Sequence, residues 1–113
     1  MAVQQQVPGL TRTDLQREDL SIPGREMIQN RVEIAPEAPA IRHWHPGEEI
    51  IYVLAGTLRY EIDGEPPLTV SAGGALTVPA ERVHAVRNVG DGEASELATY
   101  VVEKDKPLLN LAT

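Results

Sequence analysis

The chain has 113 residues, 42% hydrophobic and 24% charged, which is enough for one domain with a single core and too few for two domains of ordinary size. Its formal net charge of −7 disfavours nucleic acids and anionic membrane surfaces as partners, because like charges repel. The sequence contains no cysteine, so disulfides, thiolate metal ligands and a cysteine nucleophile are excluded, and any metal would have to be bound by nitrogen and oxygen.

Residues 1–25 have the pattern of an N-terminal arm that is partly ordered. The opening MAVQQQVPGL lacks the basic start and the apolar stretch of a signal peptide, and the longest apolar run, IIYVLAG, is too short to cross a bilayer. Residues 10–21 carry a weak helical period, which predicts a short helix or an arm lying across the domain. We therefore expect a cytoplasmic protein with an arm at 1–25 and one domain at 26–113.

Residues 26–113 have the pattern of an all-β domain. Nine glycines and nine prolines divide the chain at short intervals, and the segments between them are rich in Val, Ile, Thr and Tyr with rough alternation. The strands expected are 26–34, 40–45, 49–54, 57–62, 67–71, 75–78, 82–89 and 95–103. Eight short strands in so small a domain indicate an antiparallel sheet that is closed or sandwiched, because closure removes exposed edges.

The segment HWHPGEE at 43–49 is the first candidate for chemistry. Residues two apart on a strand point to the same face, so His43 and His45 project together. The Pro-Gly turn that follows would allow Glu49, at the start of the next strand, to lie beside both imidazole rings. Histidine pairs of this spacing also occur by chance on exposed strands, so the pair by itself is a weak signal.

The remaining histidine, His84, lies in the strand expected at 82–89 and would join this group only through the fold. Alternation places Val86 and Asn88 on the same face of that strand. Two or three imidazoles and one carboxylate suit Mn, Fe, Co, Ni, Cu or Zn, and leave coordination positions for water or substrate. Such an open site is typical of catalysis.

Two longer patterns connect these residues. From His43 the chain reads H-x-H-x3-E-x6-G, and from Gly73 it reads G-x5-P-x-E-x2-H-x3-N. They resemble the two conserved motifs of the cupin superfamily over residues 28–103. The positions kept are His43, His45, Glu49, Gly56, Gly73, Pro79, His84 and Asn88. The opening glycine of the first motif falls at Glu37 and the inner glycine of the second is Glu81, and both departures are at turn positions.

The resemblance implies a specific fold and a specific site. The fold would be the antiparallel double-stranded β-helix, or jelly-roll barrel, of a small single-domain bacterial cupin, with six or eight strands. One divalent transition metal per chain would be bound by His43, His45, Glu49 and His84. Small cupins of this kind are commonly homodimers. Trp44 and Tyr52, on the outward parity, could form an aromatic patch between subunits or pack within the protein.

Strand alternation predicts which residues line a pocket beside the metal. Those that share a face with the candidate ligands are Ile41, Ile51, Val53, Val86 and Asn88, so the wall would be largely apolar, and core packing is the competing role for each apolar position. Tyr60 is expected to share in this wall. The arginines at 42, 59 and 87 all fall on the outward parity, which disfavours anionic sugar-type substrates because their charge would be left without a partner.

Two classes of function remain open. In one, the protein is a metal-dependent enzyme acting on a small organic molecule, either an oxidoreductase of the dioxygenase type or a Lewis-acid isomerase or decarboxylase. Glu49 would then hold the metal and accept a proton, and Tyr60 would act as an acid. In the other, it is a sensor module that binds a small molecule or a metal without turnover, because one fold hosts both kinds of function.

Overall fold

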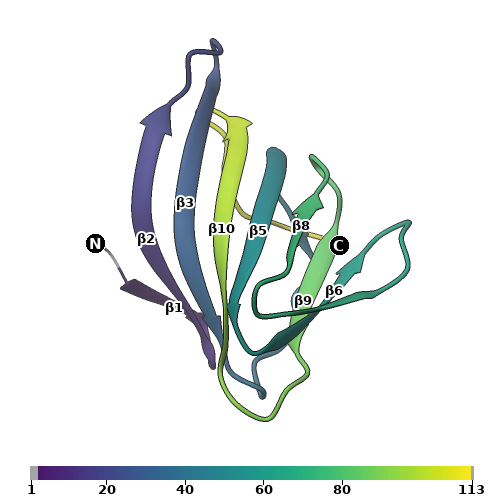
Figure 1. The fold of residues 1–113 in the computed structure, drawn as a ribbon. Coiled ribbons are helices and arrows are strands. Elements are labelled where there is room, and N and C mark those ends of the chain that lie inside the picture. Colours follow the sequence, from purple (N-terminus) through teal and green to yellow (C-terminus); the bar gives the residue numbers. More distant parts are fainter. Residues whose placement is uncertain (1–2, 113) are drawn as a thin grey trace.

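The computed structural model describes residues 3–112, which form two antiparallel sheets (Figure 1). The six-stranded sheet has the order β1 (Val3–Val7), β2 (Leu10–Asp19), β3 (Arg25–Ile34), β10 (Ala94–Glu103), β5 (Gly47–Ala55) and β8 (Ala75–Val78). The five-stranded sheet has the order β11 (Asn110–Leu111), β4 (His43–Trp44), β9 (His84–Asn88), β6 (Thr57–Ile62) and β7 (Leu68–Ser71). No helix occurs within these residues, so the predicted all-β jelly-roll barrel is confirmed.

The eight expected strands correspond to β3 through β10. Most of their ends agree within two or three residues, but the strand expected at 40–45 is reduced to His43–Trp44. The chain before it contains Pro36 and Pro39, which have no N–H to donate to a ladder, and Pro46 follows. The short strand β11 has no counterpart among the expected strands.

The helix considered for residues 10–21 is wrong, because Leu10–Asp19 forms β2. This strand pairs with β3 from Leu10 opposite Ile34 to Asp19 opposite Glu26, with an irregularity between Asp14 and Gln16. β1 adds on its other side, so residues of the expected arm are strands of the six-stranded sheet. The helical period was weak, and a ladder of hydrogen bonds to the open edge of β3 outweighs a weak local preference.

The core lies between the two sheets. Side chains of β5 and β10 alternate strictly between buried and exposed or half-buried positions, as expected of strands with one face on the core. The largest fully buried side chains include Tyr60, Ile34, Ile51, Leu58 and Val53, which come from both sheets. In Figure 1 β2, β3, β10 and β5 lie side by side as one curved sheet, with β9 and β6 belonging to the other. The inner faces of the two sheets therefore enclose a shared interior.

Two further features complete the description. Within residues 3–112 there is no helix long and apolar enough to span a membrane. The expected aromatic patch of Trp44 and Tyr52 is not a single surface, because Trp44 lies in the five-stranded sheet and Tyr52 in the six-stranded sheet. Tyr52 is exposed, beside Ile50 and Leu54 on the same outward face of β5.

Gly47 supplies a test of how closely β5 and β10 pack. It is buried opposite Val102, and a Cβ atom at this position would meet the backbone carbonyl of Val101 and come within 2.7 Å of the Val102 Cα. Backbone cannot move aside as a flexible side chain can, so we expect Gly47→Ala to lower the free energy of unfolding by about 3 kcal/mol, measured by urea denaturation. Gly92→Ala is the control, because nothing lies within 4 Å of its Cβ position. Equal stability of the two variants would contradict this packing.

Candidate metal centre

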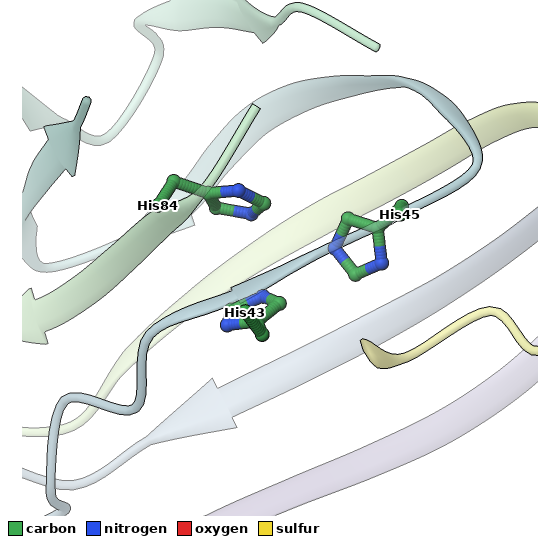
Figure 2. A group of neighbouring side chains, drawn as sticks. All are labelled: His43, His45 and His84. Atoms are coloured by element: carbon green, nitrogen blue, oxygen red, sulfur yellow. The ribbon is translucent and has the colours of Figure 1, made fainter. Parts of the chain in front are cut away.

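Both sheets contribute side chains to one point in the interior. His43 lies in β4 directly opposite His84 of β9, so these two rings belong to neighbouring strands of the five-stranded sheet. His45 follows β4, and Glu49 enters from β5 of the six-stranded sheet. Figure 2 shows the three imidazole rings grouped together. All three histidines of the chain therefore meet, as the spacing of the two motifs predicts.

The distances are those of a ligand cluster. One nitrogen from each of His43, His45 and His84 can be chosen so that all three lie within 4.8 Å of one another. The Oε1 atom of Glu49 lies 3.1 Å from His84 Nε2 and 3.2 Å from His45 Nε2. His45, Glu49 and His84 are buried, and His43 is half-buried. The four residues predicted as ligands are thus brought together, and the three histidines could hold a metal ion.

Each histidine ring is fixed by a hydrogen bond from its other nitrogen. The Nδ1 atoms of His43, His45 and His84 lie 2.7, 2.8 and 2.9 Å from backbone carbonyl oxygens. Those carbonyls belong to Ile41, Leu108 and Arg82, respectively. A carbonyl can only accept, so each Nδ1 must carry the proton, and in a neutral ring Nε2 is then left with a lone pair. This arrangement, in which the outer nitrogen is held by an acceptor, is typical of metal-binding histidines.

Within residues 3–112, only histidines come within ion-pair distance of Glu49. The Nε2 atom of His45 is buried. The Glu49 carboxylate comes close to it but lacks the geometry of a hydrogen bond, so this nitrogen has no hydrogen-bond partner among the described residues. Lone pairs directed at one another and at a carboxylate repel, and such an arrangement is stable only around a cation or a proton. Three nitrogens and one carboxylate oxygen form a donor set that fits a divalent transition metal.

The pKa shifts agree with this description. Burial, followed by the neighbouring His84, lowers the pKa of His43 to about 4, so its ring is neutral at pH 7. Burial acts against the charged form of His84, but the contact with Glu49 outweighs it and the pKa of His84 is raised. Burial likewise opposes ionisation of Glu49, yet His45 and His84 outweigh it and lower its pKa. Glu49 is therefore a carboxylate, and a metal or a proton on His84 would balance it.

A cavity of about 320 Å³ adjoins the cluster. Ile41, Ile51 and Val86 lie in its wall as predicted. Val53 and Asn88 lie outside this wall. Val53 is fully buried within the apolar core, and the Asn88 amide donates to the carbonyl oxygens of Ile34 and Gly92, both at 2.8 Å. Alternation gave the correct face for both, but each lies further along its strand than the cavity extends.

Tyr60 lies in the cavity wall beside a partner that the sequence reading missed. Its hydroxyl donates a hydrogen bond of 2.6 Å to Glu96 Oε1. Burial, followed by the charge of Glu49, raises the pKa of Glu96 to about 8. Glu96 shares the inward parity of β10 with Ala98 and Tyr100, and an acidic residue on a buried parity was the signal that could have identified it.

Tyr100 and Arg12 are among the other cavity residues that the sequence did not predict. Tyr100 packs edge-on against His45, with ring centroids 4.7 Å apart. Arg12 lies on β2, in the segment expected to be a short helix or an arm, and strand alternation was therefore not applied to it.

Comparison with known proteins agrees with the fold. The family model described as "Cupin domain" matches residues 30–100. Polyketide synthase CurC of Streptomyces cyaneus is 46% identical over 54 residues, which are 46% of this chain and 34% of that protein. Dimethylsulfoniopropionate lyase DddQ of Ruegeria pomeroyi is 32% identical over 69 residues, 51% of this chain and 34% of that protein. The matched segment spans only about a third of both relatives.

A solved structure gives a broader match. Oxalate oxidase in complex with the substrate analogue glycolate superposes with a TM-score of 0.72 and 27% identity, covering 95% of this chain and 57% of that one.

Glu96 predicts how the stability of the metal-free protein depends on pH. Its pKa of about 8 exceeds the value near 4.3 of an unfolded chain, so the folded state holds the proton more tightly. This contribution to stability is complete below about pH 4.3 and is lost as pH rises toward 8. We expect Glu96→Gln, which keeps an acceptor for Tyr60, to have a higher Tm than the parent at pH 8.5 and a similar Tm at pH 4.5, measured with chelator present. The exposed Glu61→Gln is the control, and a parent Tm that exceeds that of Glu96→Gln at pH 8.5 would refute the assignment.

Proposed function

This chain belongs to the Cupin domain family, and from that membership we propose that it is a metal-dependent enzyme acting on a small organic molecule. The observation that carries the proposal is the convergence of three histidines and Glu49 beside a cavity of about 320 Å³. A cavity of this volume is at the lower end of the range for small-molecule sites. The ligand is therefore a small one.

One divalent transition metal per chain would be held by Nε2 of His43, His45 and His84 and by the carboxylate of Glu49. Imidazole and carboxylate ligands suit Mn, Fe, Co, Ni, Cu and Zn. When bound, the metal would polarise a substrate oxygen as a Lewis acid or take part in chemistry with O₂. Glu49 would be committed to the metal, because its carboxylate already lies against two of the imidazoles.

Tyr60 and Glu96 would move the proton. Their hydroxyl and carboxyl groups share a buried hydrogen bond at the cavity wall, and the raised pKa of Glu96 means that it holds a proton at neutral pH. A proton held near neutral pH is what a general acid requires. The apolar side chains of Ile51 and Val86 would exclude water from the same space. In this proposal Tyr60 donates the proton to the substrate, and Glu96 then returns a proton to Tyr60.

The reaction would be that of an oxidoreductase of the dioxygenase type or of a Lewis-acid isomerase or decarboxylase. Relatives in sequence and structure carry the names lyase, oxidase and polyketide synthase, which supports an enzyme and leaves the reaction class to experiment. A homodimer is also proposed, and the exposed row of Ile50, Tyr52 and Leu54 on β5 is the surface that it would bury.

Metal content tests the centre itself. We expect the purified protein to take up about one divalent transition metal per chain, measured by mass spectrometry of the metal after dialysis. Glu49→Gln and His84→Ala should each weaken metal binding at least tenfold, because loss even of an outer partner of a ligand typically costs that much. Glu61→Gln removes an exposed carboxylate from β6 and should leave the affinity unchanged. Full metal content in His84→Ala would contradict the proposed ligands.

Turnover tests the enzyme. Metal-loaded protein would be assayed for oxygen uptake and product formation with a panel of diketones, catechols and flavonols. For a substrate that is turned over, Tyr60→Phe should lower kcat about 100-fold at unchanged metal content, because it removes a proton donor and no metal ligand. Tight binding of these compounds without oxygen uptake or any new product would favour a sensor module instead.

A further inference from the structure

Arg12 places a positive charge in the cavity, at some distance from the metal centre. It lies on β2 opposite Val32 of β3, and Val32 in turn lies opposite Glu96 of β10. Opposed residues in an antiparallel sheet point to the same face, so Arg12 and Glu96 share the inner face of the six-stranded sheet, two strands apart. Both line the cavity, and Arg12 is half-buried there. The guanidinium therefore faces the same space as the three histidines.

Only part of the hydrogen-bonding capacity of Arg12 is used by its neighbours in the sheet. With the Asn30 amide turned so that its oxygen faces Arg12, that oxygen accepts from Nε at 2.8 Å and from Nη2 at 3.1 Å. A guanidinium has five N–H groups, and the contact with Asn30 engages only its Nε and Nη2 atoms. The ion pairs among residues 3–112 include Arg17, Arg31, Arg42 and Arg82 but not Arg12. Among the side chains that the structure describes, no aspartate or glutamate lies within ion-pair distance of Arg12.

The acids of the cavity do not provide that neutralisation. Glu49 lies against His45 and His84, and Glu96 accepts a hydrogen bond from the Tyr60 hydroxyl. Glu96 forms no ion pair with Arg12 among the described residues. One arginine and a divalent cation would outweigh Glu49 and Glu96 even with both acids ionised, and would leave the cavity positive within a wall that is otherwise largely apolar. An unpaired charge in such surroundings is costly, and an anionic ligand would remove the cost.

Tyr100 connects the two ends of the cavity. Its ring lies edge-on to His45 and also beneath Arg12, whose Cζ is 6.0 Å from the ring centroid. An aromatic ring interacts with the flat face of a guanidinium and restricts its motion. The N–H groups lie in the plane of the guanidinium, so this interaction does not use them. A ligand along Tyr100 would reach Arg12 at one end and the histidines at the other.

We propose that Arg12 binds an anionic group of the substrate, so that the substrate class is a small organic acid with a carboxylate at one end, an apolar body, and an oxygen function at the metal. This inference rests on the proposed function only for the oxygen function at the metal. Anionic substrates were disfavoured because no basic side chain was expected inside the barrel, and Arg12 removes that reason. The arginines at 42, 59 and 87 are exposed as expected, but Arg12 lies in the segment expected to be a short helix or an arm and was not considered.

The test compares two probes that differ only in charge. 4-Acetoacetylbenzoate carries a diketone for the metal and a carboxylate at the far end of its ring, and 4-acetoacetylbenzamide replaces that carboxylate with a neutral amide. We expect the parent protein to bind the acid about tenfold or more tightly than the amide, because a charge-assisted hydrogen bond contributes about that factor. Isothermal titration would give both dissociation constants, and added salt should weaken binding of the acid alone.

Variants assign the preference to Arg12. Arg12→Gln should bind acid and amide equally at unchanged metal content, and Arg12→Lys should keep part of the preference. Arg59→Gln removes the same charge from the exposed face of β6 and should keep all of it. Circular dichroism would establish that each variant is folded, and Arg12→Lys together with the salt dependence of the parent decides the matter if Arg12→Gln does not fold. A parent protein that does not prefer the acid, or an Arg12→Gln variant that still does, would overturn the inference.

Failure of the metal centre would look different. The ratio of the two affinities would also be measured after removal of metal by chelation. A preference for the acid that persists there and disappears in Arg12→Gln supports Arg12 whether or not the protein takes up metal, whereas loss of metal uptake alone contradicts only the proposed centre.

Discussion

The structure depends on one arrangement of hydrogen bonds around the three imidazole rings. Carbonyl oxygens of Ile41, Arg82 and Leu108 accept from the Nδ1 atoms, so in a neutral ring the lone pair is on Nε2, toward the cluster. The carboxylate of Glu49 lies among them. Four electron-rich groups in a buried space are unfavourable in the absence of a cation. Side chains fixed in this way could hold a metal ion with little rearrangement.

The fold supplies this arrangement from distant parts of the chain. Cross-strand pairing of β4 with β9 sets His43 opposite His84, and close packing of β5 on β10 brings Glu49 from the other sheet. The residues after β10 return to β4, where the Leu108 carbonyl accepts a hydrogen bond from His45 Nδ1 and the Ala112 N–H donates to the Arg42 carbonyl. Glu81, where the motif would have glycine, adopts a φ of 61° and donates its N–H to the His45 carbonyl. A left-handed conformation costs a residue other than glycine about 1 kcal/mol of conformational free energy, and the chain keeps the turn with glutamate at this position.

Strand alternation and turn residues predicted the all-β domain, and the resemblance to the two cupin motifs supplied the barrel and the four candidate ligands. Alternation sets the face of a strand, and the motif spacing of His43, His45, Glu49 and His84 does not depend on loop detail. What failed depended on pairing between strands, which no pattern within a single segment records. β2 forms because β3 offers an edge, which no period within residues 10–21 records, and Arg12 entered the cavity with it. Val53 lies outside the cavity because alternation gives the face of a residue and says nothing of how far along the strand a cavity reaches.

The interior thus has two ends, a metal centre of three histidines and Glu49 and an arginine on β2, joined by Tyr100. The most direct test of the first end is the anomalous diffraction of crystals of metal-loaded protein, recorded on both sides of the absorption edge of the metal. The account predicts a single strong peak among the Nε2 atoms of the three histidines and the Glu49 carboxylate. A peak at Nδ1 or elsewhere on the chain, or a loaded protein with no peak between these four side chains, would contradict it.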